Sequence, residues 1–220
     1  LEANTYKTKQ SNFNNDSNQL IYKDNKDELE IKSDKQFEKN NTLYAEGNVL
    51  VSYRGNFLKA ETIVYDKSLK VLNARGDIKL IIGQQLFMMN EIQYDFVNKK
   101  GFMLEVNGLI NTKSFVDDLI SNFSDSDIQK IESFLDIKKE KVLYTPGELD
   151  NWVFSTDKIN IEGNTWKSKK AYFTNDILEL KQVKIEINSL EASAESDQLK
   201  FKSALNYLIL DEKLGIPFWF

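Results

Sequence analysis

The sequence predicts an all-β domain, an elongated and slightly open roll of repeated antiparallel hairpins with a short helical insert. Apolar and polar residues alternate with a period of two over most of the chain from residue 29 onwards. Such alternation is typical of half-buried strands, because successive strand side chains point to opposite faces. Turn residues recur at a spacing of roughly ten residues, which favours a sandwich, roll or barrel. A pair of strands also repeats along the chain.

The repeat has an offset of 29 residues. Residues 45–49 read AEGNV and residues 74–78 read ARGDI, while residues 60–66 read AETIVYD and residues 89–95 read MNEIQYD. A fixed period indicates one supersecondary unit used again and again. We expect two strands per unit, with the Gly-Asn and Gly-Asp pairs in turns between strands, where the backbone needs glycine. Stacked units would share a continuous apolar interior.

Composition excludes several classes of function. The chain has 220 residues, 41 % of them apolar and 12 % aromatic, and a net charge of −5 without a basic stripe. Nucleic-acid binding therefore has little support. The absence of cysteine and histidine removes metal sites of those types, Ser–His and Cys–His catalysis, and disulfides. We assign no catalytic residue, no cofactor and no metal.

The chain divides into three predicted parts. Residues 1–27 are a polar, flexible lead-in, residues 28–213 form the roll, and the apolar residues 214–220 begin a connection to a further segment. Leu1 is not a natural first residue, so we expect a processed or truncated chain. At about residues 114–137 the period changes to that of two short amphipathic helices. These helices either cover one end of the sheet or dock a partner. Their apolar positions are Phe115, Leu119, Phe123, Ile128, Ile131 and Leu135.

Residues 47–49, 58–61, 65–66 and 74–78 together resemble the repeat unit of the OstA/LptA family. Beyond them, residues 152–161, 171–176 and 216–218 are similar to the periplasmic domain of the LptD lipopolysaccharide-assembly proteins, just before its outer-membrane barrel. The lack of cysteine and the insert depart from that pattern and indicate a divergent branch.

The resemblance implies a jelly-roll lipid conduit in the periplasm, attached to the outer membrane through a C-terminal barrel, rather than an enzyme. The implied partners are lipopolysaccharide or a related glycolipid, an upstream LptA- or LptC-like jelly roll, and a barrel of the same or another chain. An acyl chain exposed to water costs ~0.8 kcal/mol per methylene, so a dry groove between two sheets would be needed. The candidate groove residues are Val49, Val51, Ile78, Leu80, Ile82, Ile92, Tyr94, Phe102, Leu104, Val106, Ile159, Ile161, Ile185 and Ile187. The same alternation is also typical of ordinary core.

Leu29 and Ile31 mark the predicted partner edge, where an upstream roll would add its strands. The alternative is that the lead-in covers this edge. Two other functions stay open: a free-standing LptA- or LptC-like bridge, and a carbohydrate-binding sandwich whose exposed Trp152, Trp166 and Trp219 form a sugar platform. The carboxylates Asp66 and Asp95 fall at equivalent turns, and a repeated environment favours turn formation over acid–base catalysis.

Overall fold

The computed structural model describes residues 29–53, 55–120, 151–176, 180–195 and 198–219. Within them the fold is one antiparallel sheet of 13 strands and one short helix, α1 (Phe115–Ile120). The strands are β1 (Glu30–Lys32), β2 (Lys35–Lys39), β3 (Thr42–Tyr53), β4 (Asn56–Asp66), β5 (Val71–Ile82), β6 (Gln85–Asp95), β7 (Lys100–Asn111), β8 (Asn151–Glu162), β9 (Thr165–Thr174), β10 (Val183–Glu195), β11 (Gln198–Lys202), β12 (Asn206–Leu210) and β13 (Leu214–Phe218). The predicted all-β class is confirmed.

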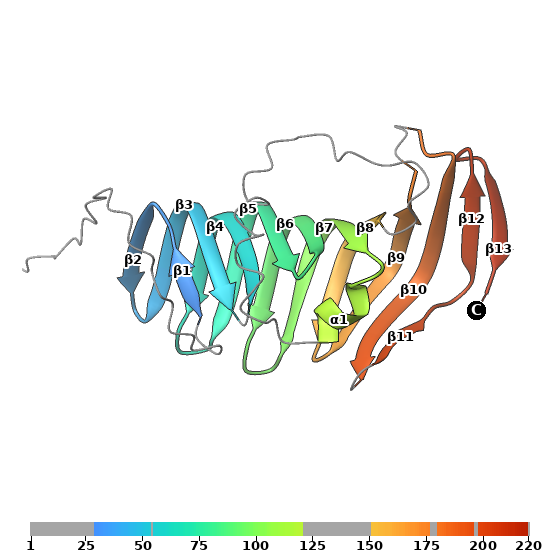
Figure 1. The fold of residues 1–220 in the computed structure, drawn as a ribbon. Helices are drawn as coiled ribbons and strands as arrows, with labels where there is room; N and C mark the ends of the chain where they lie inside the picture. The colour runs from blue at the N-terminus through green and yellow to red at the C-terminus, as the bar shows by residue number, and fades with distance from the viewer. Residues whose placement is uncertain (1–28, 54, 121–150, 177–179, 196–197, 220) are drawn as a thin grey trace, which may run out of the picture.

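The strands follow one another along the sheet in nearly the order of the sequence. The path runs from β1 through β3, β4 and so on to β10, β12 and β13, and β2 and β11 pair with β3 and β10 off this path. Figure 1 shows the resulting long row of strands, with β1 and β2 at one end and β12 and β13 at the other. Because the path does not return to its start, the roll is open rather than a closed barrel.

Each long strand bends at one position and so contributes to both layers of the roll. The register of β3 with β4, of β4 with β5 and of β5 with β6 shifts at that position. At the bend, the spacing between inward-facing residues changes from two to three or four, as from Ala60 to Ile63 or from Ala74 to Ile78. The register shifts in these three pairs mark β-bulges, which kink a strand and increase its twist.

The Gly-Asn and Gly-Asp pairs of the repeat occupy these bends. Gly47 and Asn48 have φ angles of 76° and 43°, and Gly76 and Asp77 have φ angles of 81° and 45°. Both pairs lie inside long strands, in β3 and β5. The expectation that they form turns between strands was therefore wrong, although the reason for glycine holds, because glycine adopts such angles without steric cost. Asn and Asp adopt them more readily than other residues with side chains. The 29-residue unit is two bent strands.

Inward-facing residues at matching register form two rows, one in each layer. Row A runs across the sheet from β1 to β13, and row B runs from β4 to β11. Row A consists of Ile31, Val51, Leu58, Leu80, Phe87, Gly108, Phe154, Phe173, Ile185, Leu208 and Ile216. Row B consists of Tyr65, Leu72, Tyr94, Gly101, Ile161, Trp166, Ala192 and Phe201. Every residue in the two rows is apolar or glycine.

The two rows pack against each other in the first half of the roll and seal it. Val49, Ile63, Ile78 and Met103 are almost completely buried in one continuous core. Tyr65, Tyr94 and Phe96 complete this core with edge-to-face ring contacts, which aromatic pairs prefer. These side chains form the core of this half of the roll.

Several predicted segments fall partly outside the described residues. The lead-in, residues 1–27, lies outside them, and so does the second predicted helix with Ile128, Ile131 and Leu135. Of the insert the structure describes α1, which contacts β10 and β11. Residues 214–218, expected to begin a connection to a further segment, form the last strand of the sheet, β13, paired with β12.

Candidate functional site: an apolar cavity in the second half of the roll

A cavity of about 470 Å³ lies between the two layers in the second half of the roll. Strands β6 to β11 and α1 surround it. Its lining residues are Phe87, Ile110, Thr112, Phe115, Trp152, Phe154, Ile159, Trp166, Lys167, Ser168, Phe173, Ile185, Ile187, Leu190, Ala192 and Phe201. The volume lies within the range of ~300–1,000 Å³ that is usual for small-molecule sites.

Rows A and B part to create this cavity. Phe87 of row A and Trp166 of row B meet edge to face, with ring centroids 5.6 Å apart. Beyond this contact row A continues along the cavity wall with Phe154 and Phe173, whose ring centroids are 5.0 Å apart. Row B continues on the facing wall with Ala192 and Phe201. Aromatic and aliphatic side chains therefore cover both walls.

Helix α1 forms a side wall, held in place by a buried polar cluster. The Asp118 carboxylate accepts hydrogen bonds from the Gln85 side chain at 2.6 Å, the Gln84 backbone at 2.9 Å and the Ser114 hydroxyl at 2.8 Å. Gln85 is fully buried, and its side-chain oxygen accepts from the Asn111 backbone at 2.8 Å. The cluster satisfies groups whose burial without partners would be costly.

The position that the cluster gives α1 brings an aromatic ring to the cavity. Phe115 lies parallel to Phe201, with centroids 6.4 Å apart and 12° between the planes. Phe201 belongs to β11, so this stack joins the helix to the far edge of one layer.

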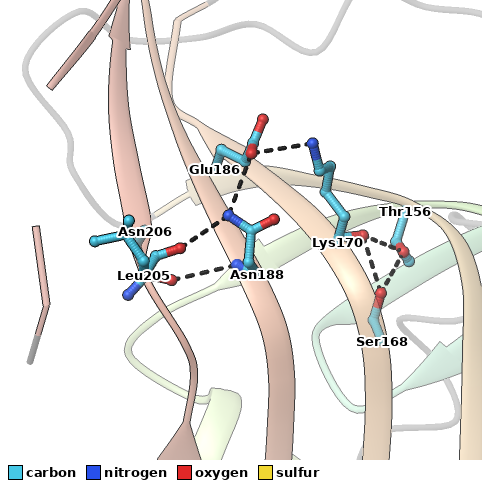
Figure 2. A network of polar contacts seen from close by, with 7 residues as sticks. All are labelled: Thr156, Ser168, Lys170, Glu186, Asn188, Leu205 and Asn206. Carbon is cyan, nitrogen blue, oxygen red and sulfur yellow. Dashed lines mark hydrogen bonds and ion pairs between the residues drawn. The ribbon is translucent and has the colours of Figure 1, made fainter. Parts of the chain in front are cut away.

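The few polar groups on the wall are already satisfied. The hydroxyls of Thr156 and Ser168 lie 2.6 Å apart. The Lys170 carbonyl accepts hydrogen bonds from Thr156 at 2.7 Å and from Ser168 at 2.9 Å (Figure 2). Lys167 forms an ion pair with Glu162 at 2.9 Å, and this hydrogen bond and charge raise the pKa of the lysine. The wall therefore presents little unmet hydrogen-bonding demand, which suits an apolar occupant.

The layers separate at Asn188, where β10 changes partners. One half of β10 pairs with β12 and the other with β11. The Asn188 side chain donates to the Leu205 carbonyl at 2.9 Å and its backbone N–H donates to the Asn206 side chain at 3.3 Å (Figure 2). Asn206 is fully buried. These bonds direct β11 and β12 into different layers and so hold this end of the roll apart.

An ion pair borders this branch point. Lys170 lies 3.1 Å from Glu186, which also accepts from Asn188 at 3.2 Å (Figure 2). Burial disfavours the charged form of Glu186, but the hydrogen bonds from Lys170 and Asn188 outweigh it and lower the pKa of this carboxyl. The pair lies beside the branch point and does not line the cavity.

Both rows reach the surface at the C-terminal end of the roll. Row B ends at Phe201, which is 46 % exposed, and row A ends at Ile216, which is 44 % exposed. At the other end, Ile31 packs against the core. An apolar path therefore leads from the cavity to solvent at the C-terminal end.

Twelve of the fourteen predicted groove residues divide among three environments. Ile159, Ile185 and Ile187 line the cavity. Six others are buried in the sealed core and three are half-buried against it. The buried residues are Val49, Val51, Ile78, Ile92, Val106 and Ile161, and the half-buried residues are Leu80, Ile82 and Tyr94.

The prediction that Phe102 and Leu104 face the groove was wrong, because both side chains lie on the outer face. Met103 between them is fully buried, and Phe102 carries the Lys158 ammonium 5.1 Å from its ring centroid. The bend of β7 at Glu105, with φ 53°, explains the error. The bend puts Met103 and Val106, three residues apart, on the same face, so alternation counted back from Val106 assigns the wrong side.

The sequence prediction missed most of the aromatic lining. Phe87, Phe154, Phe173 and Phe201 were not assigned to the site, although Trp152 and Phe154 alternate as same-face strand residues do. Trp152 and Trp166, expected in an exposed sugar platform, are half-buried and line the cavity. Trp219 is 79 % exposed, as that hypothesis required.

Leu29 and Ile31 lie at the N-terminal edge of the sheet. β1 pairs with one half of β3 and β2 with the other, so the two short strands together form that edge. Both side chains pack against the core, and the edge itself is backbone. Partner binding at this edge stays a prediction.

The repeated carboxylates serve turns. Asp66 accepts from the Ser68 and Leu69 backbones at 2.8 Å, and Asp95 accepts from Val97 and Asn98 at 2.9 and 2.8 Å. The expectation that these aspartates form turns is confirmed. Within the described ranges, acidic residues nowhere gather in a group able to hold a metal ion. In the same part of the chain, no helix is long and apolar enough to span a membrane.

Fold and cavity together define the class, an open all-β roll with an apolar pocket at one end. Residues 146–220 match a family described as a protein of unknown function (DUF3769). Among solved structures, LptH of Pseudomonas aeruginosa is similar at 11 % identity, with 61 % of this chain and 75 % of that chain covered and a TM-score of 0.36. LptH is described as the LptA-homologous periplasmic component of the conserved lipopolysaccharide transport device. A search of curated proteins found no match.

Proposed function

We propose that this roll is a periplasmic lipopolysaccharide-transport domain that binds acyl chains of the glycolipid in its apolar cavity. The observation that carries the proposal is the cavity itself, about 470 Å³ between two apolar rows that both reach the surface at the same end. The resemblance of residues 47–49, 58–61, 65–66 and 74–78 to the OstA/LptA repeat supports the choice of ligand.

Transfer of an acyl chain from water into such a cavity is strongly favourable. Each buried methylene contributes ~0.8 kcal/mol, so a chain of a dozen carbons gains on the order of 10 kcal/mol if fully buried. Phe154, Phe173 and Ile187 provide the contact surface. The sugars and phosphates stay in water outside the mouth, because the wall offers them few free polar groups.

The packed core in the first half of the roll restricts the proposed lipid site to the second half. Val49, Ile78 and Met103 in the first half of the roll are almost completely buried, whereas the cavity lies in the second half. The lipid therefore rests in the second half. Passage through the first half would require the two layers to separate there.

We further propose two protein partners, one at each end of the roll. An upstream LptA- or LptC-like roll would pair its strand with β1 and β2, and an outer-membrane component would receive the lipid at the C-terminal end, as in LptD-type assembly. Strand addition is a general way for a partner to bind at the edge of an open sheet. A free-standing bridge differs only in what binds at the C-terminal end.

Binding of intact lipopolysaccharide, compared with the same molecule after complete deacylation, tests the proposal. Isothermal titration should detect the intact lipid only. Ala192→Trp fills the cavity beside Trp166 and should weaken binding by an order of magnitude or more. Val153→Trp adds the same side chain on the outer face, where Val153 is exposed, and should leave binding unchanged.

Two results would contradict the proposal. Equal affinity for intact and deacylated lipopolysaccharide would indicate sugar recognition, for which the exposed Trp219 is the candidate. Equal affinity of the Ala192→Trp and Val153→Trp variants would place the lipid outside the cavity.

A further inference from the structure

The cavity ends abruptly at one pair of rings. Phe87 is its only lining residue from β6, and within the described residues β1 to β5 contribute none. Phe87 is 2 % exposed, and its ring meets Trp166 edge to face. The pair comes from opposite layers, so the two rings together close the space between them.

The apolar rows continue on the far side of this pair. The next residue of row A is Leu80, which pairs in register with Phe87 and is half-buried against the core. In row B, Ile161 follows Trp166 and is buried. The closure is thus made by the size of two side chains rather than by a change of polarity or by backbone.

Gly108 lets the ring of Phe87 occupy this position. It pairs in register with both Phe87 and Phe154. A Cβ atom at residue 108 would lie 3.1 Å from the Phe87 ring and 3.3 Å from the Phe154 ring, which is tighter than usual packing. A residue without a side chain therefore stands between two large rings, and this arrangement fixes where the cavity stops.

We propose that Phe87 and Trp166 form a barrier that sets the depth of the cavity and thereby the longest acyl chain it takes. The inference rests on the proposed lipid binding and adds a specificity determinant to it. Chains shorter than the cavity gain contact with every added methylene. Longer chains meet the rings and leave their extra methylenes in water.

A series of saturated fatty acids of increasing length tests this barrier. For the wild type, affinity should rise about fourfold per methylene, the equivalent of ~0.8 kcal/mol, up to a break and then stay constant. Phe87→Ala should move the break to longer chains, since the space left by the ring joins the cavity to the surroundings of Leu80. Phe87→Leu should move the break by less. This smaller change keeps the test possible if Phe87→Ala fails to fold. Phe102→Ala removes the same ring from the outer face and should leave the break unchanged.

The outcomes separate this inference from the proposed function. A break at the same length in wild type and in both folded Phe87 variants would overturn the barrier while leaving lipid binding intact. Absence of fatty-acid binding by the wild type would overturn both. Circular dichroism melting curves identify the variants that fold.

Discussion

The side-chain amide of Gln85 donates to the Asp118 carboxylate across 2.6 Å and joins α1 to the first residue of β6. Gln85 is fully buried, whereas Asp118 is half-buried at the end of the cluster. Since α1 has six residues, its own backbone bonds do not stabilise it in isolation. The wall that Phe115 forms depends on this cluster.

Asp118→Ala should therefore weaken both the fold and the cavity. Loss of the carboxylate leaves the buried Gln85 amide with fewer partners, which costs roughly 1–3 kcal/mol in the free energy of unfolding. Lipid affinity should fall as well, because Phe115 loses its fixed position. Urea unfolding and lipid titration measure the two effects. Asp117→Ala, one residue away on the exposed side, is the control; an equal loss in that variant would refute the role of the cluster.

Gly76→Ala should cost more stability than Gly163→Ala, although both glycines have positive φ, 81° and 60°. At residue 163 nothing lies within 4 Å of the added Cβ, so the cost is that of the left-handed conformation, about 1–2 kcal/mol. At residue 76 the Cβ would also lie 2.9 Å from Glu61 Cβ, which cannot move away without its backbone. Thermal melts of the two variants compare them. Equal losses would show that the bend tolerates a side chain.

The faces of β7 can be tested by truncation of neighbouring residues. Met103→Ala should lower the free energy of unfolding by about 2–5 kcal/mol, as for other fully buried large side chains. Leu104→Ala should cost clearly less, since a half-exposed side chain loses less burial. Chemical denaturation gives both values. The reverse ranking would mean that the bend at Glu105 is misplaced.

Asp95 should contribute a pH-dependent increment of stability. The Asn98 backbone N–H, followed by the Asn98 side chain, donates to this carboxylate and holds its pKa below the ordinary value of 3.8. The increment is therefore fully present above 3.8 and is lost as the pH falls through the lower pKa of the folded state. Asp95→Asn should be less stable than wild type at neutral pH, with a difference in urea midpoint that narrows below that value. A difference independent of pH would mean that the charge of Asp95 does not matter.

Alternation and repeat were enough to predict the strands, because each half of a bent strand keeps the period of two. They predicted the inner face correctly where glycine accompanies the bend, as in β3 and β5. The bends in β7 and β10 place Glu105 and Ser189 at φ 53°, and neither residue type signals such a conformation. This is why Phe102 and Leu104 were assigned to the wrong face.

The cavity could not be predicted in the same way. Phe87, Trp166 and Phe201 lie far apart in the sequence and come together through register and through the contact between layers. Periodicity carries no information on either. The separation of β11 from β12 at the C-terminal end involves Asn188 and Asn206, which look in the sequence like ordinary turn residues.

Photo-crosslinking from inside the cavity tests the central claim most directly. A photoreactive phenylalanine analogue in place of Phe173, which lines the cavity, should form adducts with lipopolysaccharide, and the same analogue in place of the outward Val153 should form none. The two positions lie on neighbouring strands, so they differ mainly in the face that they occupy. Adducts at Val153 equal to those at Phe173, or no adducts at Phe173, would contradict an acyl chain held between the two layers.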